Sequence, residues 1–294
     1  MSHHVIEEIE SQPGLWAAAA GSAAAATGLP RTGERVAVIG CGTSWFMAMC
    51  YAVLREAGGA GWTDAFPASE LPRDRSYDRV LAITRSGTTT EILEALHGVR
   101  GRVPTTAITG DPRTPIADAA DDLVVLGDAD ERSVVQTRFA TTVLALLRAS
   151  LGEDLARAVV DAQTALALPV DAYADAEQVS FLGTGWTIGL AHEAALKMRE
   201  AAQAWTESYA AAEYRHGPIS VAQAGRLTWV FGAVPEGLAD QVAATGATLV
   251  HHASLDPMAA LVVAQRTAVA KALARGLDPD QPRNLTRSVI LAAR

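Results

Sequence analysis

The chain has 294 residues, of which 49% are hydrophobic and 19% charged, the composition of an ordinary globular protein with one large or two medium domains. Its formal net charge is −9, from 24 basic and 33 acidic residues, so a general attraction to nucleic acid or to an anionic membrane is not expected. The two cysteines, Cys41 and Cys50, fit neither a disulfide scaffold nor a metal site, and with no signal peptide or membrane-length apolar run visible they favour a cytoplasmic protein.

The first half of the chain alternates between helical and strand-like segments. A helix is expected over residues 5–29, and apolar runs predict buried strands at 36–40, 80–83, 105–109 and 123–126. Further helices are expected at 45–57, from residue 88, at 115–120 and at 134–151. This alternation predicts parallel βαβ units with helices on both faces of one sheet.

The pattern then repeats. A strand is expected to enter a Gly-x-Gly turn at Gly183 and Gly185, which follow Gly40 and Gly42 by the same spacing of 143 residues. A helix at 190–204 and a strand at 227–231 come next. We therefore expect an α/β protein with two tandem, doubly wound parallel-sheet domains. The expected segments are an N-terminal helix (1–30), a first domain (31–168) and a second domain with a C-terminal tail (169–294).

The turn after the expected strand at 80–83 is the most informative stretch. Around Arg85 and Gly87 it gathers five hydroxyl side chains, those of Thr84, Ser86, Thr88, Thr89 and Thr90. Thr88 and Glu91 have the spacing of a capping box, so a helix is expected to begin there. A helix N-terminus offers free N–H groups and the positive end of the helix dipole. We interpret this turn as a phosphate site; the alternative is an ordinary strand-to-helix turn.

A dinucleotide site is disfavoured. Neither Gly-x-Gly turn completes the Gly-x-Gly-x-x-Gly motif. Trp45 stands where the first turn would need a glycine, and the second turn has a glycine only nearby, at Gly189.

Two stretches of the second half carry candidate catalytic residues. Glu193, Lys197 and Glu200 share one face of an expected helix, which is typical either of a solvent-exposed ion-pair stripe or of an acid–base site beyond a glycine turn. His216 precedes Gly217 and Pro218, so it is expected in an irregular loop, as a surface histidine or as an exposed acid–base group.

Together these motifs resemble the tandem sugar-isomerase (SIS) domain family, and within it the isomerase half of glucosamine-6-phosphate synthase. The matching stretches are Cys-Gly-Thr-Ser at 41–44, Thr-Arg-Ser-Gly-Thr-Thr-Thr-Glu at 84–91, Glu-Ala-Ala-Leu-Lys-Met-Arg-Glu at 193–200, Ala-Glu-Tyr-Arg-His-Gly-Pro at 212–218 and Asp-Gln-Pro-Arg-Asn-Leu-Thr-Arg-Ser-Val at 280–289. They keep one order along residues 35–294. The resemblance implies a doubly wound parallel sheet in each domain and a homodimer whose active sites are shared at the interface.

The resemblance also implies roles for individual residues. A small-molecule sugar phosphate would be held by Ser44, Thr84, Arg85, Ser86 and Thr89 around Gly87, with Cys41, Gly42 and Thr43 lining the sugar. Glu200 matches the base that moves a proton between C1 and C2, and Lys197 matches the lysine near O1 or N1. His216 matches the ring-opening acid–base group, which in the family reaches across from the other subunit. No metal or redox cofactor is required.

Several positions depart from the synthase. Arg287 stands where the synthase has a lysine in its tail; arginine stays protonated and cannot form an imine, although it could bind the substrate or close the site. Arg85 follows Thr84 in place of a Ser-Gln pair and could add a phosphate contact, and Thr184 stands where the synthase has arginine. No glutaminase with an N-terminal cysteine precedes the first domain, so glutamine is not expected to supply ammonia within this chain.

The leading hypothesis is a phosphosugar isomerase or deaminase that converts an amino-sugar 6-phosphate into a ketose 6-phosphate, with or without release of ammonia. A pure aldose–ketose isomerase and a deglycase for sugar-phosphate amine adducts would use the same residues. A phosphosugar-binding sensor without chemistry is the non-enzymatic alternative, and it has no need for both Glu200 and His216.

Overall fold

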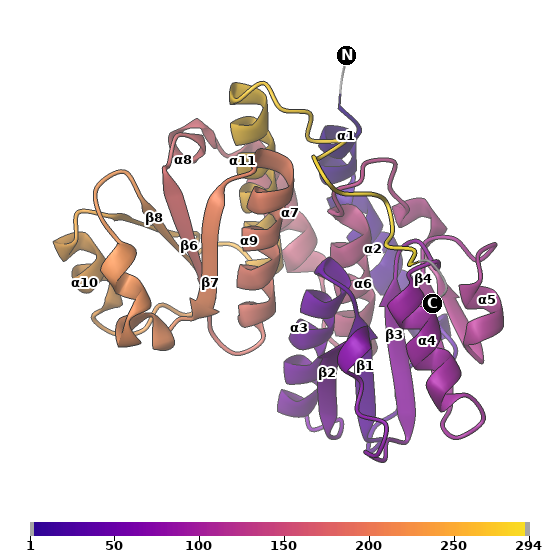
Figure 1. The fold of residues 1–294 in the computed structure, drawn as a ribbon. Helices are drawn as coiled ribbons and strands as arrows, with labels where there is room; N and C mark the ends of the chain where they lie inside the picture. Colours follow the sequence, from indigo (N-terminus) through magenta and orange to yellow (C-terminus); the bar gives the residue numbers. More distant parts are fainter. Residues whose placement is uncertain (1–2, 292–294) are drawn as a thin grey trace. The chain divides into compact units, whose positions relative to one another are not determined.

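The computed structural model describes residues 3–291, which form two compact units (Figure 1). Neither unit is continuous in sequence. The first unit holds Gly14–Arg132, Gln136–Leu155 and the tail from Thr286, and the second holds the chain up to Pro13, Ser133–Val135 and Ala156–Leu285. The expected segments are continuous, so they assign the first helix and residues 156–168 differently.

The first unit is built on a five-stranded parallel sheet in the order β2-β1-β3-β4-β5. Its strands are β1 (Val36–Gly40), β2 (Thr63–Pro67), β3 (Arg79–Thr84), β4 (Thr105–Thr109) and β5 (Asp122–Val125). Its helices are α3 (Thr43–Ala57), α4 (Thr90–Val99), α5 (Ile116–Ala119) and α6 (Arg138–Ser150), with 3-10 turns at Ala23–Ala25, Ala68–Glu70 and Gly127–Ala129.

Helices cover both faces of this sheet. Ala37 and Ile39 of β1 pack in one buried cluster with Ile92 of α4 and Ile116 of α5. Side chains alternate along a strand, so the residues between them face the other side, where α3 contacts β1 and packs against α6. Every residue of β1, β3 and β4 is buried, as in parallel sheets covered on both faces.

The second unit repeats the plan with a four-stranded parallel sheet in the order β7-β6-β8-β9. Its strands are β6 (Gln178–Gly183), β7 (Trp205–Ala210), β8 (Leu227–Phe231) and β9 (Thr248–His251). Its helices are α1 (His4–Glu10), α7 (Ala156–Ala167), α8 (Asp171–Ala174), α9 (Thr187–Ala202), α10 (Leu238–Ala244) and α11 (Pro257–Ala274), with 3-10 turns at Glu213–His216 and Pro218–Val221. The expected fold class, two doubly wound parallel-sheet units, is confirmed.

In the second unit α9 lies against β6, β7 and β8 and packs on α11, which also contacts α1, α7 and α8. On the other side of the sheet, Leu182 and Val230 pack against Leu238 and Val242 of α10. Asp280 caps α1, because its carboxylate accepts hydrogen bonds from the amides of His4 (2.9 Å) and Val5 (2.8 Å). The candidate helix α9 is therefore held between the sheet and a second helical layer.

Three expected elements differ from the structure. The helix expected over 5–29 is broken into α1 and α2 (Gln12–Ser22), because Pro13 has no N–H group and fits the first turn of a new helix but not the interior of a long one. The helix expected from 134 begins at Arg138. The apolar run that ends the tail resembles a strand in sequence, but as far as residue 291 it forms none.

No helix of the described chain combines the length and the apolar character that crossing a membrane requires.

Candidate active site

The expected site residues lie in both units, and each group is described within its own unit. In the first unit, Cys41 and Gly42 form the turn that links β1 to α3, and Thr43 and Ser44 open that helix. Gly42 has a φ of 53°, and the hydroxyls of Thr43 and Ser44 are buried at the carboxyl edge of the sheet. In an open α/β sheet this edge is where ligands bind.

Cys41 is partly exposed in this turn. Burial, and to a smaller extent the nearby Glu91 carboxylate, raises the pKa of the Cys41 thiol to about 11. The thiol is therefore neutral at pH 7, which suits a residue that lines a site better than a nucleophile.

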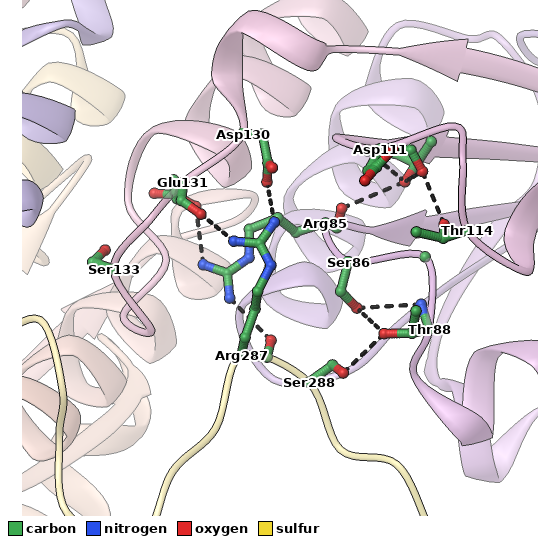
Figure 2. Close-up of polar contacts among 12 residues, drawn as sticks. Arg85, Ser86, Thr88, Asp111, Thr114, Asp130, Glu131, Ser133, Arg287 and Ser288 are labelled. Atoms are coloured by element: carbon green, nitrogen blue, oxygen red, sulfur yellow. Dashed lines mark hydrogen bonds and ion pairs between the residues drawn. The ribbon is translucent and has the colours of Figure 1, made fainter.

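The hydroxyl-rich turn joins β3 to α4 and folds back on itself. The Gly87 amide donates to Thr84 Oγ1 over 3.2 Å, and Ser86 Oγ accepts from the amide (3.3 Å) and the hydroxyl (3.1 Å) of Thr88 (Figure 2). Thr84 and Ser86 are buried. The turn thus brings hydroxyls and amides together in the way that the phosphate interpretation requires.

Gly87 is required in this turn for two reasons. Its φ of 63° lies in the left-handed region, and a Cβ added there would come within 2.0 Å of Thr114 Oγ1. Any other residue would push the turn away from Thr114, whose hydroxyl donates to the carbonyl of Asp111 over 2.9 Å.

The expected capping box is wrong. Helix α4 begins at Thr90 with Thr89 as its N-cap, and the Thr89 side chain makes no capping hydrogen bond. Thr88 Oγ1 lies instead 2.8 Å from Ser288 Oγ of the C-terminal tail, and the Thr90 amide donates to the carbonyl of Val289 over 3.2 Å. The C-terminal tail, which is distant in sequence, therefore provides the hydrogen-bond partner at the start of α4 that a local capping box was expected to provide.

Arg85 is buried, and its side chain turns toward the loop before α6. Its Nη1 lies 3.4 Å from Glu131 Oε2, and its Nη2 donates to the carbonyl of Arg287 over 3.0 Å. Glu131 Oε1 accepts hydrogen bonds from the Arg138 amide (2.8 Å) and from Thr137 Oγ1 (3.0 Å). The Arg287 side chain contacts Asp130 Oδ1 and the Glu131 carbonyl (Figure 2).

In the second unit, the three charged residues of α9 are brought together and are not a solvent-exposed stripe. Lys197 Nζ is paired with Glu200 Oε2 and lies 3.6 Å from Glu193 Oε1. The side chains of Glu193 and Lys197 are each 1% exposed, and that of Glu200 is 18% exposed. Only one carboxylate of the group reaches the surface, next to a buried ammonium.

The same helix carries a partly buried histidine. His192 Nδ1 lies 2.8 Å from Ser208 Oγ of β7, and burial, followed by the charge of Arg199, lowers the pKa of His192. His216, by contrast, is exposed and ends the 3-10 turn Glu213–His216, not the irregular loop that was expected. An exposed imidazole can exchange protons with a ligand or with water.

The turn between β6 and α9 has no cluster of hydroxyls like that of the first unit. Thr187 Oγ1 accepts from the Thr184 amide (2.8 Å) and lies 2.8 Å from the Phe231 carbonyl. A Cβ on Gly183 would come within 2.3 Å of the Thr187 carbonyl oxygen, so the glycine allows the helix to start close to the strand. This turn packs α9 onto the sheet.

Sequence reasoning missed Asp130, Glu131 and Ser288. They lie in loops where neither hydrophobic periodicity nor a glycine turn marks them, and their partners are distant in sequence. The one available signal was the pair of adjacent acids, Asp130 and Glu131, just before a helix.

Among the described residues, one group has the spacing of metal ligands, namely His3, Asp278 and Asp280. Asp280 already caps α1, the His3 side chain is 31% exposed, and the Asp278 side chain is exposed, at 52%. His3 therefore has two acidic neighbours.

Solved structures share this architecture. Glucosamine-6-phosphate deaminase from Thermotoga maritima superimposes with a TM-score of 0.81, at 24% sequence identity and over 98% of both chains. The C-terminal domain of glucosamine-fructose-6-phosphate aminotransferase from Francisella tularensis does so with a TM-score of 0.79, at 21% identity and over 96% of this chain and 99% of that domain. The chain has the SIS fold.

Sequence comparison agrees with the SIS fold. Glutamine–fructose-6-phosphate aminotransferase (isomerizing) from Sulfurisphaera tokodaii is 27% identical over 297 residues, which cover 88% of this chain and 50% of that protein. The chain spans about half the length of the curated relatives that it matches. No protein-family model matches the sequence. The similarity supports the resemblance to the isomerase half of the synthase.

Proposed function

We propose that this chain is an enzyme that isomerises or deaminates an amino-sugar 6-phosphate. The observation that carries the proposal is the group on α9 in which Lys197 lies between the carboxylates of Glu193 and Glu200. A buried ion group of this kind is weak support for a purely stabilising role, because desolvation offsets much of its Coulombic gain. A carboxylate beside a fixed cation is, however, what proton abstraction next to a carbonyl requires.

The reaction begins with ring opening. The bond between C1 and O5 of the cyclic sugar breaks, the O1 proton is removed and O5 gains a proton. His216 is suited to this exchange, since an exposed imidazole can both donate and accept a proton.

The isomerisation step then belongs to α9. Glu200 takes the proton from C2 of the open aldose, the electron pair forms the C1–C2 double bond, and negative charge develops on O1. Lys197 stabilises that charge as an ammonium, with Glu193 holding it in place. A proton then moves from the hydroxyl or amine on C2 to O1, the oxygen or nitrogen on C2 forms its double bond to that carbon, and Glu200 returns the proton to C1.

The group on C2 decides the outcome. With an amine there, the product of the proton shift is an imine at C2; water adds to it, ammonia leaves and a ketose 6-phosphate remains. With a hydroxyl, the same shift is a plain aldose–ketose isomerisation, and an amine adduct at C1 would make the enzyme a deglycase. The names of the deaminase and the aminotransferase favour the amino sugar.

The phosphate is assigned to the turns of the first unit. Ser44, Thr84, Ser86 and Thr89 offer hydroxyls, and Gly87 lets the backbone approach the ligand. Arginine is not needed for this, since amides and hydroxyls at a helix N-terminus bind phosphate by themselves.

We also propose a homodimer in which His216 of the partner subunit completes each site. The exposed imidazole supports this, as do the consecutive apolar side chains of Val289, Ile290 and Leu291 in the tail, which are 52%, 70% and 55% exposed. Light scattering after gel filtration measures the mass, and a monomer would rule out the shared site.

The enzymatic proposal is tested with purified protein and glucosamine 6-phosphate or galactosamine 6-phosphate. Ammonia and ketose 6-phosphate are followed together. We expect Glu200→Gln to lower turnover by about 10²–10⁴-fold while sugar-phosphate binding is kept, because general-base catalysis contributes on that order.

The matched control is Glu177→Gln, which neutralises an exposed carboxylate of the same unit that pairs with Arg226. It should leave turnover unchanged. Binding of both sugars without turnover, equal in wild type and Glu200→Gln, would contradict an enzyme acting on these sugars and favour a sensor.

A further inference from the structure

The C-terminal tail lies across the hydroxyl-rich turn of the first unit. The Thr90 amide donates to the Val289 carbonyl (3.2 Å), and the Leu291 amide donates to Thr90 Oγ1 (3.0 Å). The hydroxyls of Ser288 and Thr88 are 2.8 Å apart (Figure 2). The tail therefore occupies the N-terminus of α4, one part of the turn that a phosphate would otherwise contact.

Two arginines join this tail to the loop before α6. Arg85 is held by Glu131, whose other oxygen accepts from the Arg138 amide at the start of α6. From there Arg85 Nη2 reaches the backbone carbonyl of Arg287 (3.0 Å). The α6 N-terminus, Glu131, Arg85 and the tail backbone thus form one connected chain of contacts.

The side chain of Arg287 connects the tail to the same loop a second time. Its guanidinium contacts Asp130 Oδ1 and the carbonyl of Glu131 (Figure 2). The tail is therefore held at one residue in two ways: its carbonyl accepts from Arg85, and its side chain donates to the loop that anchors Arg85. Planar guanidinium groups suit such multidentate contacts, and lysine could not replace them.

Each of the two arginines is paired with a carboxylate. Arg85 and Glu131 have side chains that are 1% and 0% exposed, so each needs the other as counter-ion. Arg287 and Asp130 form a second, partly exposed pair, at 39% and 31%. Because both positive charges are matched by carboxylates, a phosphate bound in the turn is left to hydroxyls and amides.

We propose that Arg85 and Arg287 are positioning residues that clasp the C-terminal tail onto the phosphate turn, and that neither is a phosphate ligand or a catalytic group. The clasp consists of Arg85, Arg287, Asp130 and Glu131. That the turn binds a sugar phosphate rests on the proposed function; that the tail is clasped does not.

Amide hydrogen exchange of the full chain, without ligand, tests the clasp directly. In Arg287→Met and in Asp130→Asn the peptides containing Thr90 and Leu291 should exchange about two- to fivefold faster, the factor that loss of a partly exposed ion pair corresponds to. The double variant should exchange no faster than Arg287→Met, because that variant already removes the contact with Asp130.

Arg35→Met is the matched control, since Arg35 and Asp78 form a comparable exposed pair in the same unit (53% and 43%). It should leave these peptides unchanged. Unchanged exchange in both clasp variants, or additive effects in the double variant, would overturn the clasp.

Activity separates positioning from catalysis. In Arg287→Met the KM for glucosamine 6-phosphate should rise while kcat is nearly kept. The loosened tail holds the phosphate turn less firmly, but no reacting group is removed. If kcat instead falls about a hundredfold or more with KM unchanged, as it does when a catalytic acid–base group is removed, the positioning role is overturned. If the wild type neither binds nor converts the sugar, the proposed function fails while the exchange result still decides the clasp.

Discussion

Lys197 is the buried cation of the candidate active site. Its ammonium is buried next to a carboxylate that is equally buried and another that reaches the surface. The sequence predicted that Glu193, Lys197 and Glu200 share a face of one helix, because helical spacing places them there. It left open whether that face is exposed, because burial depends on α11 and the sheet, which are distant in sequence.

Lys197→Met should therefore be costly to the fold as well as to activity. The substitution removes the buried ammonium that lies 3.6 Å from the buried Glu193 carboxylate, and the free energy of unfolding should fall by about 3–5 kcal/mol. Urea unfolding measures this. Glu200→Gln, at a partly exposed position, should cost about 1 kcal/mol or less.

A double variant provides the control for this prediction. Adding Glu193→Gln to Lys197→Met removes the buried charge that the single variant leaves, so part of the lost stability should return. If Lys197→Met costs no more than Glu200→Gln, the charges of Lys197 and Glu193 are not coupled as a buried pair.

At the level of elements, the strands that the sequence predicted best are the central ones. The runs expected at 36–40, 105–109 and 227–231 coincide with β1, β4 and β8, which are buried along their whole length. The edge strands β2 and β7 were missed, because Thr63–Pro67 contains a proline and Trp205–Ala210 is largely polar and partly exposed. Only pairing with a neighbour makes such segments strands.

The contact between α9 and β7 gives a pH-dependent prediction. His192 lies against Ser208, and burial lowers its pKa below the usual 6.5, so the folded state prefers the neutral imidazole. As the pH falls below 6.5 the unfolded chain takes up this proton more readily than the folded one, and stability is lost. His192→Asn removes the titrating group and should lose less stability between about pH 7 and pH 5 than wild type.

Chemical denaturation at both pH values measures the difference between the two proteins. His97→Asn, at an exposed position on α4, serves as the control. A difference between wild type and His192→Asn that does not change with pH would show that His192 does not couple protonation to folding.

The whole molecule consists of two α/β units with one strand order, since β7-β6-β8-β9 matches β2-β1-β3-β4. The sequence predicted this repetition from the equal spacing of two Gly-x-Gly turns. It could not predict that the first helix packs with the second unit and the tail with the first. Each end of the chain packs against residues that are far from it in sequence, and no local pattern marks such contacts. Asp280 capping α1 and Val289 bonding to α4 are contacts between segments far apart in the chain.

The packing of the C-terminal tail with the first unit matters for the proposed function, because that unit holds the turn assigned to the phosphate. The tail reaches the phosphate turn from far along the sequence, so the residue pattern around the turn does not reveal the contacts that the tail makes there. The resemblance placed Arg287 in the site, and its contacts with Asp130 and Glu131 give this arginine a positioning role that needs no imine chemistry.

The most direct test of the account is hydrogen exchange at the sugar carbon itself. Aldose and ketose 6-phosphates, with and without a 2-amino group, are incubated with the protein in deuterated water and followed by NMR. Proton abstraction by Glu200 predicts deuterium at C1 or C2 of at least one of them, whatever the net product, and none with Glu200→Gln. Tight binding of these sugars with no exchange in the wild type would contradict the central claim, leaving a protein that binds sugar phosphates without acting on them.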